Sequence, residues 1–374
     1  MRTSREGYEL KGISILCAAI FMNAAIAADP PAPVPPAVAP MVPGSPIPWP
    51  EWLFPIDPKS LEKNPKPVKL DDVEQLEIPD SKLKFTQARI NDPFNPPDWR
   101  PDHSPAPDVV AKGRKPNVMA CAYCHTPTGQ GRPENSALAG LPEAYFKEQL
   151  HDLRGGARKP AGPEQYLPTW NMLKIARAMT DEEIDESAKY FAQQKLRRRV
   201  YVIESLRIPR AERAAWIYEE VGGTEDLEGR LLEVTNELSR HERRDDRLEY
   251  MAYVPPGSIN RGKRLATTGK GPDGSSPNAQ ETSREATTRQ ATNVDIEKTV
   301  VCATCHGPKL MGTDKIPPIA GRQPTYLLRQ LLAFRNGTRT GEAADQMKPV
   351  VDKLTLNEMI DMVAYVSSLY PDPR

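Results

Sequence analysis

The chain has few aromatic residues, no net charge, few cysteines and little that could span a membrane. Phe, Trp and Tyr make up 6% of its 374 residues, so we expect modest apolar cores unless a bound group supplies apolar bulk. Its 50 basic and 50 acidic residues cancel. This balance argues against a nucleic-acid-binding protein, which usually carries a basic excess, and leaves no strong field for steering a partner.

The longest apolar run, 12–27, follows a basic start and is short for a membrane span. It ends in Ala25-Ile26-Ala27, a small-x-small pattern typical of signal-peptide cleavage. The sequence therefore predicts a signal peptide over 1–28 and export to the periplasm, with a retained N-terminal anchor as the alternative. Of the five cysteines, Cys17 lies inside this run. The other four belong to paired motifs, so no thiol remains for a disulfide framework.

Those four cysteines form two copies of the pattern C-x-x-C-H, Cys121 to His125 and Cys302 to His306. Two thiols three positions apart can form thioethers to the two vinyl groups of one porphyrin, and the adjacent imidazole becomes the proximal ligand of the iron. The motifs predict two covalently bound haem c groups. The predicted cofactor-binding residues are Cys121, Cys124, His125, Cys302, Cys305 and His306.

Each motif begins a longer repeat. Cys121 and Cys302 are 181 residues apart, and the same spacing relates Ala139 to Ala320, Tyr145 to Tyr326, Gln149 to Gln330 and Arg154 to Arg335. After a six-residue gap the spacing becomes 175, which relates Met172 to Met347, Thr180 to Thr355, Glu183 to Glu358 and Tyr190 to Tyr365. Two motifs that begin parallel repeats of about 70 residues are not a chance match.

The matched methionines are candidates for the sixth iron ligand, because a thioether is a soft ligand that favours reduced iron. We predict that Met172 partners His125 and that Met347 partners His306. The alternative is that both are ordinary core methionines. Competing methionines are Met179 in the first repeat and Met311, Met359 and Met362 in the second, of which the last two are expected to pack within a helix.

Two other interpretations of the motifs remain open. Two C-x-x-C pairs can make a Cys₄ zinc site, although here they lie in separate repeats. A redox-active C-x-x-C pair would be expected beside a βαβ unit, and none is visible. His103, His151 and His241 lack cysteine partners, so we expect surface or hydrogen-bonded residues, with His103 as a less favoured haem ligand.

The composition changes divide the chain into parts. After the signal peptide we expect a Pro-rich extended arm (29–105), a first domain (106–197), an insert with some strand content (198–256) and a second domain (257–374). Pro is about twice its average usage, with 40 residues, and is dense at the start of the arm. Trp49, Trp52 and Phe54 are expected to pin that stretch to the folded body.

Local patterns predict several elements. Helices are expected over 108–112, 142–154 and 260–267, and after the capping residues Thr180 and Thr355. Strands are expected over 200–203 and 250–254, with a turn at Gly222-Gly223. Irregular structure wrapped on the first domain is expected over 61–105, and a mobile loop over 268–293.

The chain resembles the class I cytochromes c over 106–195 and 257–371. The resemblance rests on motifs that follow one another in the order C-x-x-C-H, Ala-Gly, Tyr-x-x-x-Gln-Leu, Met and a capped helix. The tandem arrangement is similar to the dihaem cytochromes of the c-four type. The resemblance implies three main helices around each haem, and a periplasmic carrier that accepts electrons from dehydrogenases or feeds terminal oxidases.

The chain departs from that family in its insert, its arm and one loop residue. In the family a loop Pro offers its carbonyl to the proximal His. Pro317 matches that Pro in the second domain, whereas Ser136 stands there in the first. We therefore expect another carbonyl to orient His125, and the two haems to differ in potential.

The fold class that follows is mainly α, with two cytochrome c-like haem domains, a small partly β insert and an irregular Pro-rich arm. The function that follows is a periplasmic electron carrier rather than an enzyme. Its expected partners are a dehydrogenase or quinol-oxidising complex as donor and a terminal oxidase or another cytochrome as acceptor. One alternative is a peroxidase or thiosulfate-oxidising enzyme with one open iron. Another is the cytochrome subunit of a dehydrogenase complex, with the insert and the Pro-rich arm as docking parts. Peripheral association with the membrane also stays open.

Overall fold

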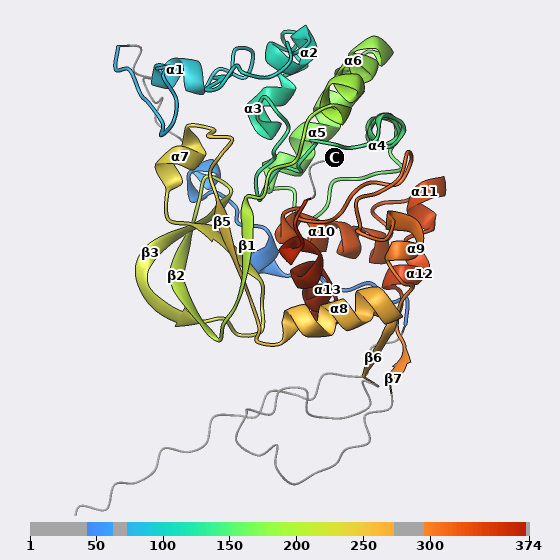
Figure 1. Ribbon diagram of the computed structural model, residues 1–374. Coiled ribbons are helices and arrows are strands. Elements are labelled where there is room, and N and C mark those ends of the chain that lie inside the picture. Colours follow the sequence, from blue (N-terminus) through green and yellow to red (C-terminus); the bar gives the residue numbers. More distant parts are fainter. Residues whose placement is uncertain (1–42, 63–72, 273–294, 372–374) are drawn as a thin grey trace, which may run out of the picture. The chain divides into compact units, whose positions relative to one another are not determined.

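The computed structural model describes residues 43–62, 73–272 and 295–371 (Figure 1). The predicted signal peptide, the start of the arm and most of the expected mobile loop lie outside these residues. No helix within the described ranges combines the length and the apolar character needed to cross a membrane. The described chain is rich in helix and contains some sheet.

The described part of the arm contains short helices, η1 (Glu51–Leu53), η2 (Pro58–Leu61) and α1 (Gln87–Ile90). Its start is held by Ile47, whose N–H and carbonyl both hydrogen-bond the side chain of Asn336, each at 2.8 Å. Phe54 is buried and packs edge-on against Tyr166, with ring centroids 5.2 Å apart. The aromatic end of the proline-dense stretch is therefore pinned to the body.

The later part of the arm contacts the insert as well as the first domain. The indole Nε1–H of Trp99 donates to the carbonyl of Arg243 at 2.7 Å. Arg100 forms buried ion pairs with Asp245 at 2.9 Å and Asp246 at 2.5 Å. We expected this stretch to wrap on the first domain, and it does contact that domain where the Ala120 N–H donates to the Pro93 carbonyl at 2.9 Å. The acidic partners of its buried guanidinium, however, lie in the insert.

The first domain contains five helices among its described residues. They are α2 (Asp108–Ala111), α3 (Cys121–His125), α4 (Glu143–Gly155), α5 (Leu167–Ala178) and α6 (Asp181–Ala192). The predicted capping box begins α6, because the Thr180 hydroxyl accepts from Glu183 N–H and the Glu183 carboxylate accepts from Thr180 N–H. α4 packs on α6 through the stacked rings of Phe146 and Phe191.

The insert is a five-stranded sheet with one short helix. Its elements are β1 (Val200–Glu204), β2 (Arg207–Ala214), β3 (Ile217–Asp226), β4 (Leu232–Thr235), α7 (Leu238–Glu242) and β5 (Tyr250–Val254). The strand order is β1-β5-β4-β3-β2, with β1 parallel to β5 and β3 parallel to β4. The strands predicted over 200–203 and 250–254 are thus neighbours in one sheet.

The turn predicted at Gly222-Gly223 is wrong, because both glycines lie inside β3. Their φ angles are 82° and 79°, in the left-handed region that glycine tolerates. The pairing of β2 with β3 shifts register between Pro209 and Ala211, opposite these glycines. The pair therefore forms a bulge that bends the strand without reversing it.

The second domain contains further helices and one small sheet. Its described elements are α8 (Ser258–Thr268), β6 (Lys270–Pro272), β7 (Asp295–Glu297), α9 (Ala303–His306), α10 (Pro324–Arg335), α11 (Glu342–Asp345), α12 (Lys348–Val351) and α13 (Leu356–Ser368). β6 pairs with β7, so the start of the expected loop is a strand. The second predicted capping box, Thr355 with Glu358, begins α13.

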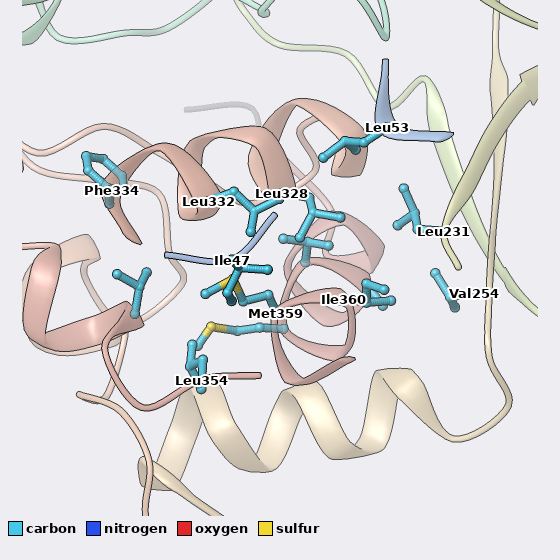
Figure 2. Packing of buried hydrophobic residues seen from close by; sticks show 14 of the residues in the cluster. Ile47, Leu53, Leu231, Val254, Leu328, Leu332, Phe334, Leu354, Met359 and Ile360 are labelled. Atoms are coloured by element: carbon cyan, nitrogen blue, oxygen red, sulfur yellow. The ribbon is translucent and has the colours of Figure 1, made fainter. Parts of the chain in front are cut away.

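The main apolar cluster of the second domain also takes residues from other parts of the chain (Figure 2). Leu328 and Leu332 of α10 pack there with Met359 and Ile360 of α13. The arm contributes Ile47 and Leu53, and the insert contributes Leu231 and Val254. The arm and the insert are therefore integral to this core.

Candidate haem sites

The first C-x-x-C-H motif forms the short helix α3, and its imidazole is oriented by one hydrogen bond. His125 Nδ1 lies 2.7 Å from the carbonyl oxygen of Ser136. Because a carbonyl only accepts, Nδ1 carries the proton and Nε2 keeps its lone pair for a metal. Burial, reinforced by nearby Arg132, lowers the pKa of His125 to about 4. The imidazole is therefore neutral at pH 7, as an iron ligand must be.

The expectation that another carbonyl orients His125 is wrong, because the carbonyl of Ser136 itself does so. The accepting group is the backbone carbonyl, which every residue has, so the change of side chain leaves the contact intact. In the second domain His306 Nδ1 lies 2.8 Å from the carbonyl oxygen of Pro317, the matched position. Both histidines present Nε2 in the same way.

The two loops that follow the motifs repeat their hydrogen bonds in register. Gly131 N–H donates to the His125 carbonyl at 3.1 Å, and Gly312 N–H donates to the His306 carbonyl at 2.8 Å. Two further bonds recur with the same spacing of 181 residues. In the first domain the N–H groups of Leu138 and Ala139 donate to the Gly129 carbonyl, and in the second those of Ile319 and Ala320 donate to the Leu310 carbonyl. The sequence repeat is thus also a repeat of backbone structure.

The thiols of the two motifs differ in exposure. Burial raises the pKa of Cys121 to about 12 and that of Cys302 to about 11. Cys121, Cys124 and Cys302 are half-buried, whereas Cys305 is exposed.

A cavity of about 1260 Å³, counting its mouth to solvent, adjoins the first motif. Cys121, Cys124 and His125 line it, and so do both candidate methionines of this domain, Met172 and Met179. The rest of its apolar wall comes mainly from Leu138, Leu141, Phe146, Leu150, Leu153 and Ile175. The apolar wall and the donors suit a porphyrin bound by two thioethers and one imidazole.

The methionines of the first domain lie in or beside one helix. Met172 lies within α5 and is half-buried, and Met179 caps the C-terminus of α5 and is buried. Both reach the cavity, so Met172 stays a prediction with Met179 as its competitor.

In the second domain Met347 caps the N-terminus of α12 and is half-buried against the apolar cluster. Met359 and Met362 are buried within α13, which is the packing role expected of them. Met311 is half-buried in the loop after the motif. Met347 therefore stays the predicted ligand of the second iron.

Three histidines lie outside the motifs, and two of them have hydrogen-bond partners within the described chain. The ring nitrogens of His103 lie 3.0 Å from Asp98 and 2.8 Å from the carbonyl of Ser104. His241 is buried and hydrogen-bonds the hydroxyl of Tyr250 at 2.9 Å, while His151 is exposed. None of the three lines the first cavity.

Residues that sequence reasoning missed connect the two domains. Arg339 Nη2–H groups donate to the hydroxyl of Tyr145 at 2.9 Å and to the amide oxygen of Gln149 at 2.6 Å, and Nη1 donates to Gln330 at 2.9 Å. Its partners thus come from both domains.

Arg158 makes the mirror-image set. It donates to the hydroxyl of Tyr326 at 3.3 Å, to Gln330 at 3.0 Å and to Gln149 of its own domain at 3.1 Å. Arg158 and Arg339 are again 181 residues apart, and their backbones form an isolated antiparallel bridge. That spacing, extended past Arg154, is the sequence signal that identifies the pair.

Neither of these two guanidinium groups forms an ion pair within the described chain, although Asp152 acts on both through space. Both line the first cavity, and among the described residues no carboxylate lies within ion-pair distance of either. Arg339 Nε, which is buried, has no hydrogen-bond partner within the described chain. Since a buried cation needs an anion to be stable, a group that carries carboxylates, as haem does, fits this wall of the cavity.

An acidic residue of the insert is buried against the start of α10. Glu233 of β4 is 2% exposed and accepts from the Thr325 hydroxyl at 2.5 Å, and its other oxygen has no partner among the described residues. Burial raises the pKa of Glu233 from 4.5 to about 7. The folded chain therefore binds this proton more tightly than the unfolded chain does.

The chain is similar in sequence to known cytochromes. The family model for cytochrome c matches residues 297–370. Cytochrome c-554(548) of Halomonas halodenitrificans is 36% identical over 73 residues, covering 19% of this chain and 88% of that protein.

Two other relatives match about seven tenths of the chain. One is named thiosulfate dehydrogenase electron acceptor, from Stutzerimonas stutzeri, and is 26% identical over 260 residues, which is 69% of this chain and 82% of the relative. A cytochrome c4 of Pseudomonas aeruginosa is 22% identical over 269 residues, 71% of this chain and 90% of the relative.

Proposed function

The chain belongs to the cytochrome c family, and on this premise we propose that it is a periplasmic dihaem carrier of single electrons, similar to cytochrome c4. One observation carries the proposal. His125 and His306 each donate from Nδ1 to a carbonyl eleven residues further on, which leaves Nε2 as an iron ligand in both domains. Each haem c, when bound, supplies one-electron chemistry at its iron.

The residues have separate roles in this proposal. Cys121 and Cys124, and likewise Cys302 and Cys305, attach the two porphyrins. Met172 and Met347 supply the sixth ligands. Arg158 and Arg339 neutralise carboxylates of the bound group at the boundary between the domains, and the apolar wall of the first cavity excludes water.

The haem content tests the attachment residues. A pyridine haemochrome assay on protein matured in a competent periplasm is expected to give two haems per chain, both retained on a denaturing gel. Fewer than two haems would contradict the proposal.

The ligand set tests whether the protein is a carrier. An iron with both axial positions filled by the chain leaves no room for a substrate, so both ferric haems should be low-spin and bind cyanide slowly. One high-spin haem, or fast cyanide binding at one iron only, would instead indicate an enzyme.

A more specific role follows from the relative named thiosulfate dehydrogenase electron acceptor. We infer that this chain accepts electrons from a dehydrogenase of that kind. Oxidised protein should be reduced when the dehydrogenase and thiosulfate are both present. Reduction by thiosulfate alone would favour the enzyme interpretation, and no reduction in the complete mixture would remove this partner.

Export to the periplasm has its own test. If the signal peptide over 1–28 is cleaved, the mature protein begins at Asp29, which intact-mass measurement detects. A mature chain that still carries residues 1–28 would favour the retained anchor.

A further inference from the structure

The insert covers the outer side of the first C-x-x-C-H helix with one arginine. Arg244 follows α7 and is buried. Its Nη1–H donates to the carbonyl of Tyr123 at 2.9 Å, and its Nε–H donates to the carbonyl of Ile90 at 2.9 Å. The guanidinium carbon also lies 3.6 Å from the centroid of the Tyr123 ring. Since Tyr123 lies between the two cysteines of the motif, Arg244 is held directly against the haem attachment site.

A second arginine contacts the same motif, but its charge is balanced. Arg132 Nε–H donates to the carbonyl of Cys124 at 3.3 Å. Arg132 also forms an ion pair of 3.1 Å with Glu134, and both side chains are buried. Arg132 and Glu134 together therefore add little net charge at the motif.

The charge of Arg244 is not balanced in this way. Among the described residues, no carboxylate lies within ion-pair distance of its guanidinium. Burial lowers the pKa of Arg244 to about 10, so the group is still a cation at pH 7. The first motif therefore has one buried and unpaired positive charge beside it.

Among the described residues, the second motif has no such arginine beside it. Thr304 holds the position that matches Tyr123 and is exposed, as is Cys305. Within the described ranges, no arginine hydrogen-bonds the carbonyl of Thr304 or Cys305. The two repeats thus differ in charge at this point although their backbones match.

We propose that Arg244 raises the reduction potential of the first haem. Ferric haem carries one more positive charge than ferrous haem, so a nearby buried cation disfavours the oxidised state. Burial keeps this repulsion strong, because the low-dielectric surroundings and the lack of mobile ions screen it weakly. The inference rests on the proposed function only because it requires a haem at Cys121 and Cys124. It gives the insert a role in setting the reduction potential of that haem.

The test is a potentiometric titration of the holoprotein, with the two haems distinguished by their NMR methyl resonances. Arg244→Gln removes the charge and keeps a donor for the Tyr123 carbonyl. We expect the equilibrium constant for reduction of the first haem to fall about tenfold, which lowers its potential by about 59 mV for a one-electron couple. The potential of the second haem should stay unchanged. Arg244→Lys, which keeps the charge, should retain most of the wild-type potential.

Arg243→Gln is the matched control, because Arg243 is adjacent and hydrogen-bonds the carbonyl of Glu77 away from the motif. Equal shifts in Arg244→Gln and Arg244→Lys would show that packing matters and charge does not, which overturns the proposal. No shift in Arg244→Gln overturns it too.

A second variant decides the matter if Arg244→Gln does not fold. Glu134→Gln removes the anion paired with Arg132 and adds net positive charge at the same motif. The potential of the first haem must then rise, and a fall or no change contradicts the proposal. The haem count of the wild-type protein is measured first, so that failure of the proposed function is recognised separately.

Discussion

Adding one methyl group at Gly262 should separate the two helices that cross in the second domain. α8 and α13 lie side by side (Figure 1), and Gly262 faces the backbone of α13. A Cβ at this position would overlap the carbonyl oxygen of Asp361 and lie 2.5 Å from its carbon and 3.0 Å from Cβ of Tyr365. The obstacle is backbone, so no side-chain rotation relieves it.

The cost follows from that overlap. Carbon atoms pack at about 3.5 Å or more, so the helices must move apart by about 1 Å. Overpacking of this kind costs about 3 kcal/mol at the upper end of the usual range. The better helix propensity of Ala returns about 1 kcal/mol. The crossing also contains the Arg261–Asp361 ion pair at 2.8 Å. We therefore expect Gly262→Ala to lower the free energy of unfolding by about 2 kcal/mol.

Urea unfolding of the holoprotein, followed by far-ultraviolet circular dichroism, measures this change at constant m value. Gly155→Ala is the matched control, because Gly155 ends α4 and an added Cβ there meets nothing within 4 Å. The control should be neutral or slightly stabilising. A loss below about 0.5 kcal/mol in Gly262→Ala, or one equal to the control, would refute the reasoning.

Three other predictions concern the haem sites and the insert. Met347→Ala should lower the potential of one haem while both haems stay attached, and an unchanged spectrum and potential would remove Met347 from the ligands. The contribution of Glu233 to stability should fall as pH rises from 4.5 to about 7, because the folded state holds the Glu233 proton more tightly. Relative to wild type, Glu233→Gln should therefore gain roughly 3 kcal/mol of stability between pH 4 and pH 8, measured by urea unfolding across pH, and an equal pH dependence in the two proteins contradicts this assignment. Arg339→Gln should weaken the contact between domains, so that they unfold in separate calorimetric transitions, whereas a single transition at the wild-type temperature would show that the pair is dispensable.

The local features of the fold could be predicted from the sequence. The capping boxes of α6 and α13 involve groups three residues apart, Thr180 with Glu183 and Thr355 with Glu358. Apolar spacing within one turn or one strand likewise predicted α4, α8, β1 and β5. α5 was not predicted, and the turn expected at Gly222-Gly223 was wrong because a glycine pair suits a bulge as well as a reversal.

The sequence likewise predicts some parts of the candidate site and not others. The attachment cysteines and the proximal histidines are contiguous, so the two motifs were visible at once. The partner of His125 was not, since a backbone carbonyl carries no signal in the identity of residue 136.

The sequence by itself determined the two haem motifs, their repeat and the helices that begin at local caps, because each depends on residues a few positions apart. The tertiary structure alone decided the strand order of the insert, the paired roles of Arg158 and Arg339 and the contact of Arg244 with Tyr123. These contacts join residues more than 100 positions apart, or strands whose pairing depends on register. They form only when packing brings distant segments together, and this is why two motifs that look alike in sequence have different surroundings.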